Sequence, residues 1–485
     1  MTTTTFTVSS KQPTLRAGDL LVLPFFTAKK AAFDKKLLPA SLNSLPAPEK
    51  AGAFKIVSVA PGDVSKSKKH RNGLAAVATA LLDKADETPF RQVRQMIAKA
   101  LSECESLGCK RVVTIIDSAH PQLCLAACES ALTAGYVFDK YLSKKKTPPQ
   151  VVLHTALPRA QFNDTRAIAE CINFARDTLN EPPLAIHPES LAKAYAQTGK
   201  KYGLKMTVWD EKKLAREKCG GILAVGGGSA SKPRLVIGSW APENAETHLA
   251  LVGKGVTFDS GGYSLKPSKS MTEMKFDMGG AAMMFGAICA IAALKLPIKV
   301  TAYLPLAHNA ISQESYNVSD VITTRSGKTI EVQNTDAEGR IILSDAIAIA
   351  CEQHPDYLID AATLTGAAVV ALGEDIAAVY GDNKKFVGKV LSAADTAGED
   401  MWPMPLFSAY DAQLSSIIAD VKNIGGAWGG SITAALFLKH FVNNVPNWIH
   451  IDIAGPGCKI DPLAHLGKGA KGYGISTMVE LARNL

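Results

Sequence analysis

Two carboxylates and a guanidinium lie within five residues of one another in the segment NTDAEGR, as Asp336, Glu338 and Arg340. A short run typical of a strand precedes them, and the apolar run 341–351, typical of a helix, follows. The first N–H groups of a helix are unpaired and favour negative charge. Carboxylates this close repel one another unless a cation joins them. The segment therefore predicts a metal site at a strand-to-helix turn.

A second segment upstream supplies further groups of the same kind. Asp259 and Asp277 each lie beside glycines, and Lys254 and Lys266 have apolar or glycine-rich surroundings. The pKa of a lysine so placed shifts downward readily, which lets the amine act as a ligand or a tuned catalytic group. One acid after a strand is more often a helix cap. Four acids, two lysines and an arginine at such junctions indicate a metal site instead.

The elements that must position these residues alternate between strand-like and helix-like runs. Expected strands cover 205–209, 234–240, 248–256, 299–304, 329–333, 357–359 and 448–453, and expected helices cover 281–294, 341–352, 384–394 and 431–442. Alternation of this kind predicts a mainly parallel sheet flanked by helices, whose ligands gather outside the carboxyl ends of the strands. The glycine-rich segment 226–229 lacks the ending of a phosphate-binding loop and is interpreted as a turn.

The N-terminal part has a similar pattern, with expected strands at 20–26, 54–60, 111–117 and 150–154 and a helix at 91–107. A chain of 485 residues is too long for one ordinary core. We therefore predict an α/β fold of two domains, each a mixed or mainly parallel sheet flanked by helices, with the C-terminal catalytic domain larger. The predicted boundaries are an N-terminal α/β domain at 1–165, a linker helix and turn at 166–184, and a catalytic domain at 185–485.

Several motifs together resemble those of the cytosolic leucine aminopeptidases, a family of two-metal exopeptidases. The matching segments are VGKGVTFDSGG, SLKP, MKFDMGG, NTDAEGR, DAATLTG, NIGG and HIDIAG. The resemblance is dense from about residue 173 to the end of the chain and loose before it. It implies a leucyl aminopeptidase that removes leucine and other bulky apolar residues from the N-termini of peptides, by means of a metal-bridged hydroxide.

The resemblance also implies two divalent ions per subunit. Asp259 and Glu338 would contact both ions. Lys254, as a neutral amine, and Asp277 would complete the tighter site, and Asp336 would complete the more exchangeable one through its side chain and main-chain carbonyl. The resemblance implies zinc or manganese, with magnesium or cobalt as substitutes. A ligand set without His also suits such oxygen-preferring ions.

Two catalytic roles follow from the same resemblance. Lys266 would stay cationic and stabilise the oxyanion of the tetrahedral intermediate. Arg340 would hold a bicarbonate ion that acts as general base. The free α-amine of a peptide substrate would bind a metal, which accounts for exopeptidase action. The implied substrate-binding residues are Met274, Thr363, Leu364, Gly366 and Ala454.

The chain departs from the family pattern at two places. His308-Asn309-Ala310 stands where Glu-Asn-Met is common, and Ala427 stands where arginine is usual. Neither belongs to the implied ligand set, so we expect changed pocket walls or subunit contacts rather than loss of activity. A two-metal phosphoesterase is an alternative with similar carboxylates, although it would more typically add His ligands.

Positive charge is concentrated in the N-terminal part. Residues 1–160 carry 23 Lys and Arg against 12 Asp and Glu, with clusters at 66–71 and 144–146. Such clusters attract nucleic acid, although solvated loops are the commoner explanation. A DNA-binding or scaffolding hexamer with secondary peptidase activity is therefore the second hypothesis. The family resemblance implies a homohexamer in either case.

The nine cysteines are scattered and form no CxxC pair, which favours reduced thiols. The N-terminus has no apolar core of signal-peptide length, and the uncharged run 279–294 is shorter than a membrane span. We expect a cytoplasmic protein with no membrane contact, in which 279–294 is a buried helix.

Overall fold

The computed structural model describes residues 1–11, 13, 16, 19–26, 54–58, 76–82, 89–463 and 466–485. The basic cluster predicted at 66–71 and the end of the strand predicted at 54–60 lie outside these residues. The chain forms two compact units, Met1–Asn173 with Asp461–Lys468, and Phe174–Ile460 with Gly469–Leu485. The division falls inside one helix, α4 (Asn163–Asn180). The exact domain boundaries and the linker at 166–184 remain a prediction.

The first unit contains a six-stranded sheet in the order β1-β6-β5-β2-β4-β3. Its strands are β1 (Phe6–Ser9), β2 (Asp19–Phe26), β3 (Phe54–Ser58), β4 (Ala76–Leu82), β5 (Arg111–Ile115) and β6 (Gln150–His154). All neighbours are parallel except β3 and β4. Helices α2 (Pro89–Ser106) and α3 (Pro121–Ala134) pack with the strands around a core that includes Val22, Ile97 and Val112. The 3-10 helix η3 (Arg159–Phe162) precedes α4.

The second unit contains a nine-stranded sheet in the order β16-β15-β18-β14-β9-β11-β8-β7, with β10 paired to β11. Its strands are β7 (Lys205–Trp209), β8 (Arg234–Trp240), β9 (His248–Gly253), β10 (Gly255–Asp259), β11 (Lys299–Asn309), β14 (Tyr357–Ala362), β15 (Ala377–Tyr380), β16 (Met401–Pro403) and β18 (Trp448–Asp452). The central strands β18, β14, β9 and β11 run parallel. A small sheet joins β12 (Val321–Thr323), β13 (Thr329–Glu331) and β17 (Val421–Lys422).

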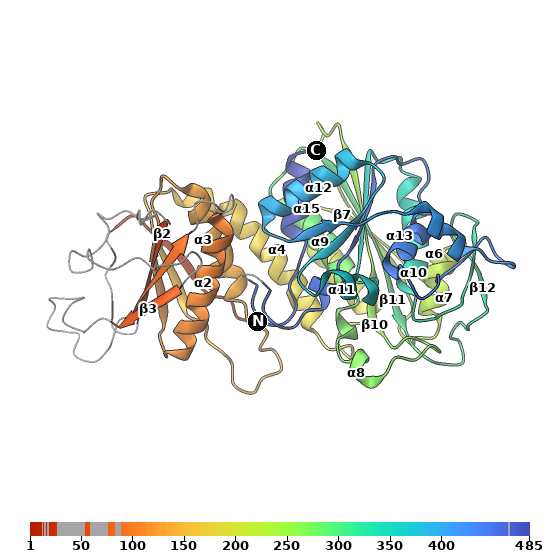
Figure 1. The fold of residues 1–485 in the computed structure, drawn as a ribbon, viewed down its shortest axis with the longest axis horizontal. Coiled ribbons are helices and arrows are strands. Elements are labelled where there is room, and N and C mark those ends of the chain that lie inside the picture. The colour runs from red at the N-terminus through yellow and green to blue at the C-terminus, as the bar shows by residue number, and fades with distance from the viewer. Residues whose placement is uncertain are drawn as a thin grey trace. The chain divides into compact units, whose positions relative to one another are not determined.

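Helices cover both faces of the large sheet (Figure 1). On one side lie α9 (Gly279–Ala293), α12 (Lys384–Ala397) and α15 (Ile475–Arg483), and on the other α7 (Gly220–Gly227), α10 (Gly339–Cys351) and α13 (Gly430–Lys439). The remaining helices are α5 (Pro188–Lys201), α6 (Glu211–Arg216), α8 (Ser268–Met271), η4 (Met274–Phe276), α11 (Gly366–Leu372), η5 (Ser408–Leu414) and α14 (Ala454–Cys458). The predicted α/β class, with a larger C-terminal catalytic domain, is therefore confirmed.

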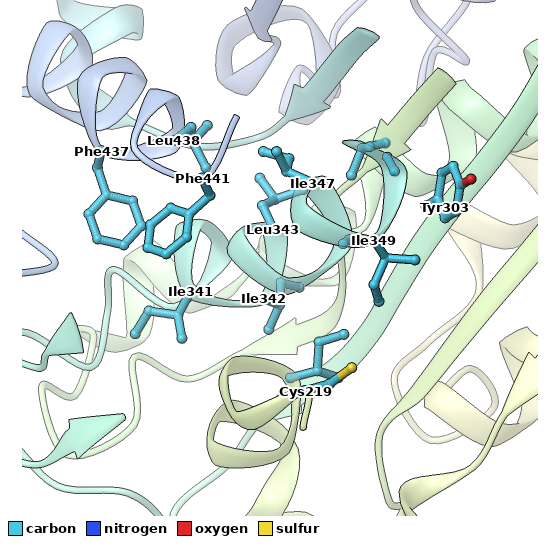
Figure 2. Close-up of a cluster of buried hydrophobic side chains, with 14 of the residues drawn as sticks. Cys219, Tyr303, Ile341, Ile342, Leu343, Ile347, Ile349, Phe437, Leu438 and Phe441 are labelled. Carbon is cyan, nitrogen blue, oxygen red and sulfur yellow. The ribbon is translucent and has the colours of Figure 1, made fainter. Parts of the chain in front are cut away.

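Helix α10 is the centre of this unit, and every one of its residues is buried. Its isoleucines and leucine pack against Phe437 and Leu438 of α13, Phe441 beyond it, and Tyr303 of β11 (Figure 2). A helix fixed on all sides holds its N-terminus in one place. The acidic residues that precede α10 are therefore attached to a rigid support.

The expected mixed or mainly parallel sheet is confirmed, since the outer strands β8 and β7 are antiparallel to their neighbours and the central strands are parallel. Two other expectations about the second unit need correction. The strand expected at 248–256 is two strands, β9 and β10, separated at Lys254. The glycines at 226 and 227 end the helix α7 instead of forming a turn. A Cβ on Gly226 would lie 2.6 Å from Pro233 Cβ, so close packing is one physical reason for a glycine there.

One helical stretch, 268–293, is long and apolar enough to cross a membrane by length and composition. Its most apolar window is 94% buried inside the protein. Such burial is typical of a core helix. The stretch is therefore weak evidence for a membrane span.

Candidate metal centre

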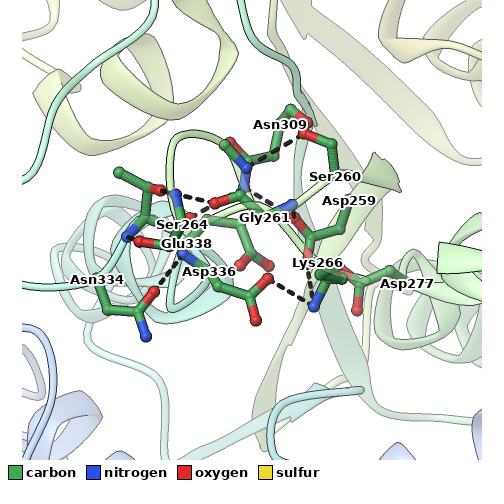
Figure 3. Close-up of polar contacts among 12 residues, drawn as sticks. Asp259, Ser260, Gly261, Ser264, Lys266, Asp277, Asn309, Asn334, Asp336 and Glu338 are labelled. Atoms are coloured by element: carbon green, nitrogen blue, oxygen red, sulfur yellow. Dashed lines mark hydrogen bonds and ion pairs between the residues drawn. The ribbon is translucent and has the colours of Figure 1, made fainter. Parts of the chain in front are cut away.

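Charged side chains from four segments meet at the carboxyl ends of parallel strands (Figure 3). Lys254 follows β9, and Asp259 is the last residue of β10. Asp277 lies just before α9, and Glu338 is the N-cap residue of α10. The convergence places the candidate ligands at the sheet edge where ligands of parallel α/β sheets gather.

One half of the centre is deeply buried. Lys254 Nζ lies 2.7 Å from Asp277 Oδ1 and 2.8 Å from Glu338 Oε1. The same nitrogen donates a hydrogen bond to the carbonyl oxygen of Thr363, at 3.0 Å. The three charged side chains are 4%, 5% and 1% exposed. One buried ammonium group therefore offsets only part of the charge of two buried carboxylates.

The other half is partly open to solvent. Lys266 Nζ lies 2.9 Å from Asp259 Oδ2 and 2.6 Å from Asp336 Oδ1. Asp259 is buried, but the side chain of Asp336 is 31% exposed. Figure 3 shows Lys266 placed between these two carboxylates. An ion leaving this half would have a shorter path to water than one leaving the Lys254 half.

The carboxylates are arranged to share a cation. Oxygen atoms of Asp259, Asp336 and Glu338 all lie within 4.8 Å of one another. Asp277 Oδ2 is buried and has no hydrogen-bond partner among the described residues, whereas Glu338 Oε1 is paired with the Lys254 ammonium group at 2.8 Å. Buried acceptors without a partner are costly and call for an explanation. Divalent cations fit the centre, because oxygen donors are what they prefer and their charge would offset the crowded acids.

Burial and crowding change the pKa values in the centre. Burial, followed by the charge of Asp259, raises the pKa of Asp336 to about 6. Burial also raises the pKa of Asp277. Burial alone would lower the pKa of Lys254, but Asp277 and Glu338 outweigh it and raise the pKa. Without cations the charged form of Lys254 is therefore favoured, and its neutral form stays a prediction for the metal-bound state.

Glycines make room for Lys254. A Cβ on Gly339 would lie 2.5 Å from Lys254 Cε. A Cβ on Gly280 would lie 2.1 Å from the carbonyl oxygen of Ala361, and one on Gly253 would lie 2.5 Å from the carbonyl oxygen of Gly280. The absent side chains let the N-termini of α9 and α10 approach the strand ends. This explains why the motifs around the candidate ligands are rich in glycine.

Asn309 and Thr335 hold the loops of the centre together, and neither was predicted as a site residue. Asn309 Nδ2 donates to Asp259 Oδ1 at 2.8 Å and to the carbonyl oxygen of Thr335 at 3.0 Å. Thr335 Oγ1 donates to the carbonyl oxygen of Gly261 at 2.6 Å. The only sequence signal for Asn309 was its place after the apolar run of β11, beside the departure at His308.

Arg340 is the second residue of α10 and is buried. One guanidinium nitrogen donates to the carbonyl oxygen of Asn423 at 2.9 Å, and Phe437 lies beneath the group, 6.0 Å from its ring centre. Its Nε atom is buried without a hydrogen-bond partner among the described residues. Burial lowers the pKa of Arg340 to about 10, although the carboxylates of Glu338 and Asp452 oppose the shift. A donor without a partner leaves capacity for an anion.

The predicted substrate-binding residues lie on segments next to the centre. Thr363 Oγ1 donates to Asp277 Oδ1 at 2.9 Å. Leu364 follows in the same loop and Gly366 begins α11, where an added Cβ would meet no atom within 4 Å. Ala454 begins α14, and Met274 begins η4, three residues before Asp277. The structure describes their positions, and their contact with substrate stays a prediction.

Comparisons with known proteins agree with this geometry. Residues 173–479 match the model of the "Cytosol aminopeptidase family, catalytic domain". A "Probable cytosol aminopeptidase" of Rhodopirellula baltica is 46% identical over 69% of this chain and 66% of its own length. One of Streptomyces avermitilis is 39% identical over 96% of this chain and 92% of its own length.

A solved structure has the same fold. It is the "Bottromycin maturation enzyme BotP in complex with Mn", with a TM-score of 0.83 and 31% sequence identity over 96% of this chain and 99% of that one. Family model, relatives and solved structure agree with one another and with the converging acids. The chain belongs to the cytosol aminopeptidase family.

Proposed function

We propose that this aminopeptidase uses two divalent cations to release leucine and other bulky apolar residues from the N-termini of peptides. The observation that carries the proposal is the convergence of three carboxylates within 4.8 Å of one another, flanked by two lysines. The solved relative whose name includes Mn supports a divalent ion in this fold. Zinc or manganese is the proposed ion, and magnesium or cobalt would substitute.

Each half of the centre would hold one cation. Lys254, Asp277 and Glu338 would hold the buried one, with Asp259 shared between the two. Asp336 would complete the partly exposed position, where its side chain reaches solvent. When bound, the pair would activate water as a nucleophile and polarise the scissile carbonyl group. Lys254 must lose its proton to act as a ligand, so uptake of the buried cation would release a proton.

Lys266 is the proposed stabiliser of developing negative charge. It lies beside Asp259 and Asp336, whose carboxylates outweigh the effect of burial and raise its pKa. With cations bound to those carboxylates, the ammonium group would face the substrate, and its positive charge in that state is part of the proposal. A fixed positive charge beside the reacting carbonyl would stabilise the oxyanion.

Arg340 is the proposed binding residue for a bicarbonate ion that would accept a proton from the attacking water. The unpartnered Nε atom supports an anion there. The free α-amine of the substrate would bind to the cation pair, with its first side chain near Met274, Thr363, Leu364, Gly366 and Ala454. We also propose a homohexamer, as the family resemblance implies, and a cytosolic location, which the name of the relatives supports.

A panel of aminoacyl amides tests the proposal directly. The protein is freed of metal, reloaded with one defined ion, and assayed with leucyl, alanyl, lysyl and glutamyl amides, with bound metal counted by elemental analysis. We expect the leucyl amide to be hydrolysed fastest and two ions to be bound per chain. Activity that survives both metal removal and Asp336→Ala would overturn the proposed mechanism. A phosphate monoester serves as the control for phosphoesterase chemistry and should not be cleaved.

The structure favours no second function for the basic residues that it describes. In the cluster 144–146, Lys145 donates to the carbonyl oxygens of Asp139 and Lys140, and Lys146 lies 3.5 Å from Glu105. These are contacts of a solvent-exposed loop. The hypothesis of a DNA-binding or scaffolding hexamer therefore stays a prediction.

A further inference from the structure

We propose that Asp452 is a positioning residue that sets both walls of the first-residue pocket, and this inference rests on the proposed function. Asp452 is the last residue of β18, pairs in register with Ala362 of β14, and is buried. It belongs to none of the predicted catalytic, metal or substrate-binding residues. Its carboxylate acts between the two segments that would touch the substrate.

One oxygen atom of Asp452 joins the two segments. Oδ1 accepts a hydrogen bond from Leu364 N at 3.1 Å and another from Ala454 N, also at 3.1 Å. The loop after β14 and the start of α14 are therefore held at a fixed separation by one atom. Ile453 N reinforces the junction by donating to the carbonyl oxygen of Ala362 at 2.8 Å.

The second oxygen atom fixes the start of helix α11. Oδ2 accepts a hydrogen bond from Thr365 Oγ1 at 2.7 Å. The same hydroxyl accepts from Ala368 N at 3.0 Å and so caps α11. Capping by threonine stabilises a helix start and defines where the chain turns. Asp452 thus controls the whole segment from 364 to 368.

This segment continues directly into the metal centre. Thr363, the residue before Leu364, accepts a hydrogen bond from Lys254 through its carbonyl and donates one to Asp277 through its hydroxyl. Its methyl group packs beside Gly279 and Gly457, where an added Cβ would lie 3.1 Å and 3.0 Å away. A shift of the loop would therefore change the pocket wall at its contact with the buried half of the centre.

Burying a carboxylate between two loops costs free energy unless both of its oxygens accept hydrogen bonds. Here it has three, two backbone N–H groups and one hydroxyl. Its removal would leave two N–H groups without an acceptor and release both walls. Misplacement of a substrate-positioning segment by about 1 Å can cost about a hundredfold in rate.

The test compares Asp452→Ala with Asp452→Asn in the metal-loaded enzyme. Asparagine keeps an acceptor for Leu364 N and Ala454 N, whereas alanine removes it. We expect alanine to lower kcat/KM for the best amide of the panel by about a hundredfold. We also expect it to lower the preference for that amide over the alanyl amide by at least about fivefold, and asparagine to restore most of both. Manganese binding, measured by calorimetry, should still reach two ions per chain.

Two further variants separate positioning from folding. Thr365→Val removes the hydroxyl that donates to Asp452, and Thr365→Ser keeps it. Only Thr365→Val should therefore lower the preference for the best amide over the alanyl amide. Asp360→Asn changes a buried carboxylate on neighbouring β14 that accepts from Trp448 and His450 and does not touch the loop. It should lower the melting temperature without changing the preference.

Unchanged preference in both Asp452→Ala and Thr365→Val, at full metal content, would overturn the role of Asp452. If Asp452→Ala fails to fold, the Thr365 pair decides alone. A wild-type enzyme that prefers a residue other than leucine would correct the proposed function, while the comparison of variant with wild type would still test Asp452.

Discussion

The two halves of the metal centre use the same residue types and differ in their access to water. Each pairs one lysine with two carboxylates at distances of 2.6–2.9 Å. The Lys254 half is enclosed by the glycine-rich starts of α9 and α10, whereas the Lys266 half includes Asp336, which is partly exposed. Burial strengthens electrostatic interactions and slows exchange. The difference teaches that one set of residue types can make one enclosed half and one half that is partly open to solvent.

The largest expected effect comes from breaking the buried half. Asp277→Ala should lower kcat/KM by more than about a hundredfold, because loss of residues that only support metal ligands already costs 10–100-fold. Excess manganese should not restore the activity, since the remaining partners of the cation are too few. Asp336→Ala in the exposed half should regain part of its activity under the same excess. Equal rescue of the two variants by manganese would contradict the distinction between a buried and an exposed half. Asp382→Ala, a change on the exposed surface, serves as control.

Lys266 offers a way to test the exposed half without removing a carboxylate. Lys266→Met should lower kcat by about a hundredfold or more, the cost of losing one group that stabilises an oxyanion. The number of bound ions should stay the same, as elemental analysis would show. Lys269→Met, three residues along on α8, is the matched control and should behave like the wild type. Loss of metal in Lys266→Met would show that the lysine supports the ligands instead.

A chelator should remove the two ions at different rates, one from each half of the centre. Dialysis against a chelator of moderate strength should remove one ion per chain first and the second more slowly, because the Asp336 position has the shorter path to solvent. Elemental analysis of samples taken at intervals would follow both steps. Asp336→Ala should abolish the fast step only. Simultaneous loss of both ions would count against two unequal positions.

The smallest expected effect is on the pH dependence of metal affinity in the two halves. The pKa of Asp336 is raised to about 6. Because a proton on Asp336 competes with a cation, the affinity of the exposed half for metal should fall as the pH drops through about 6. Lys254 has a raised pKa, so binding in the buried half releases a proton throughout the neutral range. The affinity of that half should therefore rise about tenfold per pH unit. Calorimetry in buffers of different ionisation enthalpy would count the protons, and a count of zero at pH 7 would contradict ligation by Lys254.

Much of the centre could be predicted from the sequence, because its candidate ligands lie close together within short motifs. Asp336 and Glu338 lie on one turn, and their types and spacing already indicate a cation. Asn309 and Asp452 could not be predicted in this way. Their hydrogen bonds reach residues far along the chain, such as Thr335 and Leu364, and depend on which strands become neighbours.

The fold had a similar limit. Alternating apolar runs indicate strands and helices, yet the direction of β7 and β8 leaves no mark in their residue patterns. Glycines at 226 and 227 have low helix propensity, which favoured a turn. Tertiary packing outweighs that propensity, since α7 lies so close to its surroundings that a Cβ on Gly220 would be 2.0 Å from the carbonyl oxygen of Thr323.

Lys254 and Lys266 give the folded chain its own counterions. Each ammonium group already offsets part of the charge of two carboxylates, so the chain can complete folding before any ion arrives. Metal delivery then becomes a later exchange of one positive charge for another. Which ion the enzyme carries would accordingly reflect the supply at the moment of loading, and the same polypeptide could hold different ions as that supply changes.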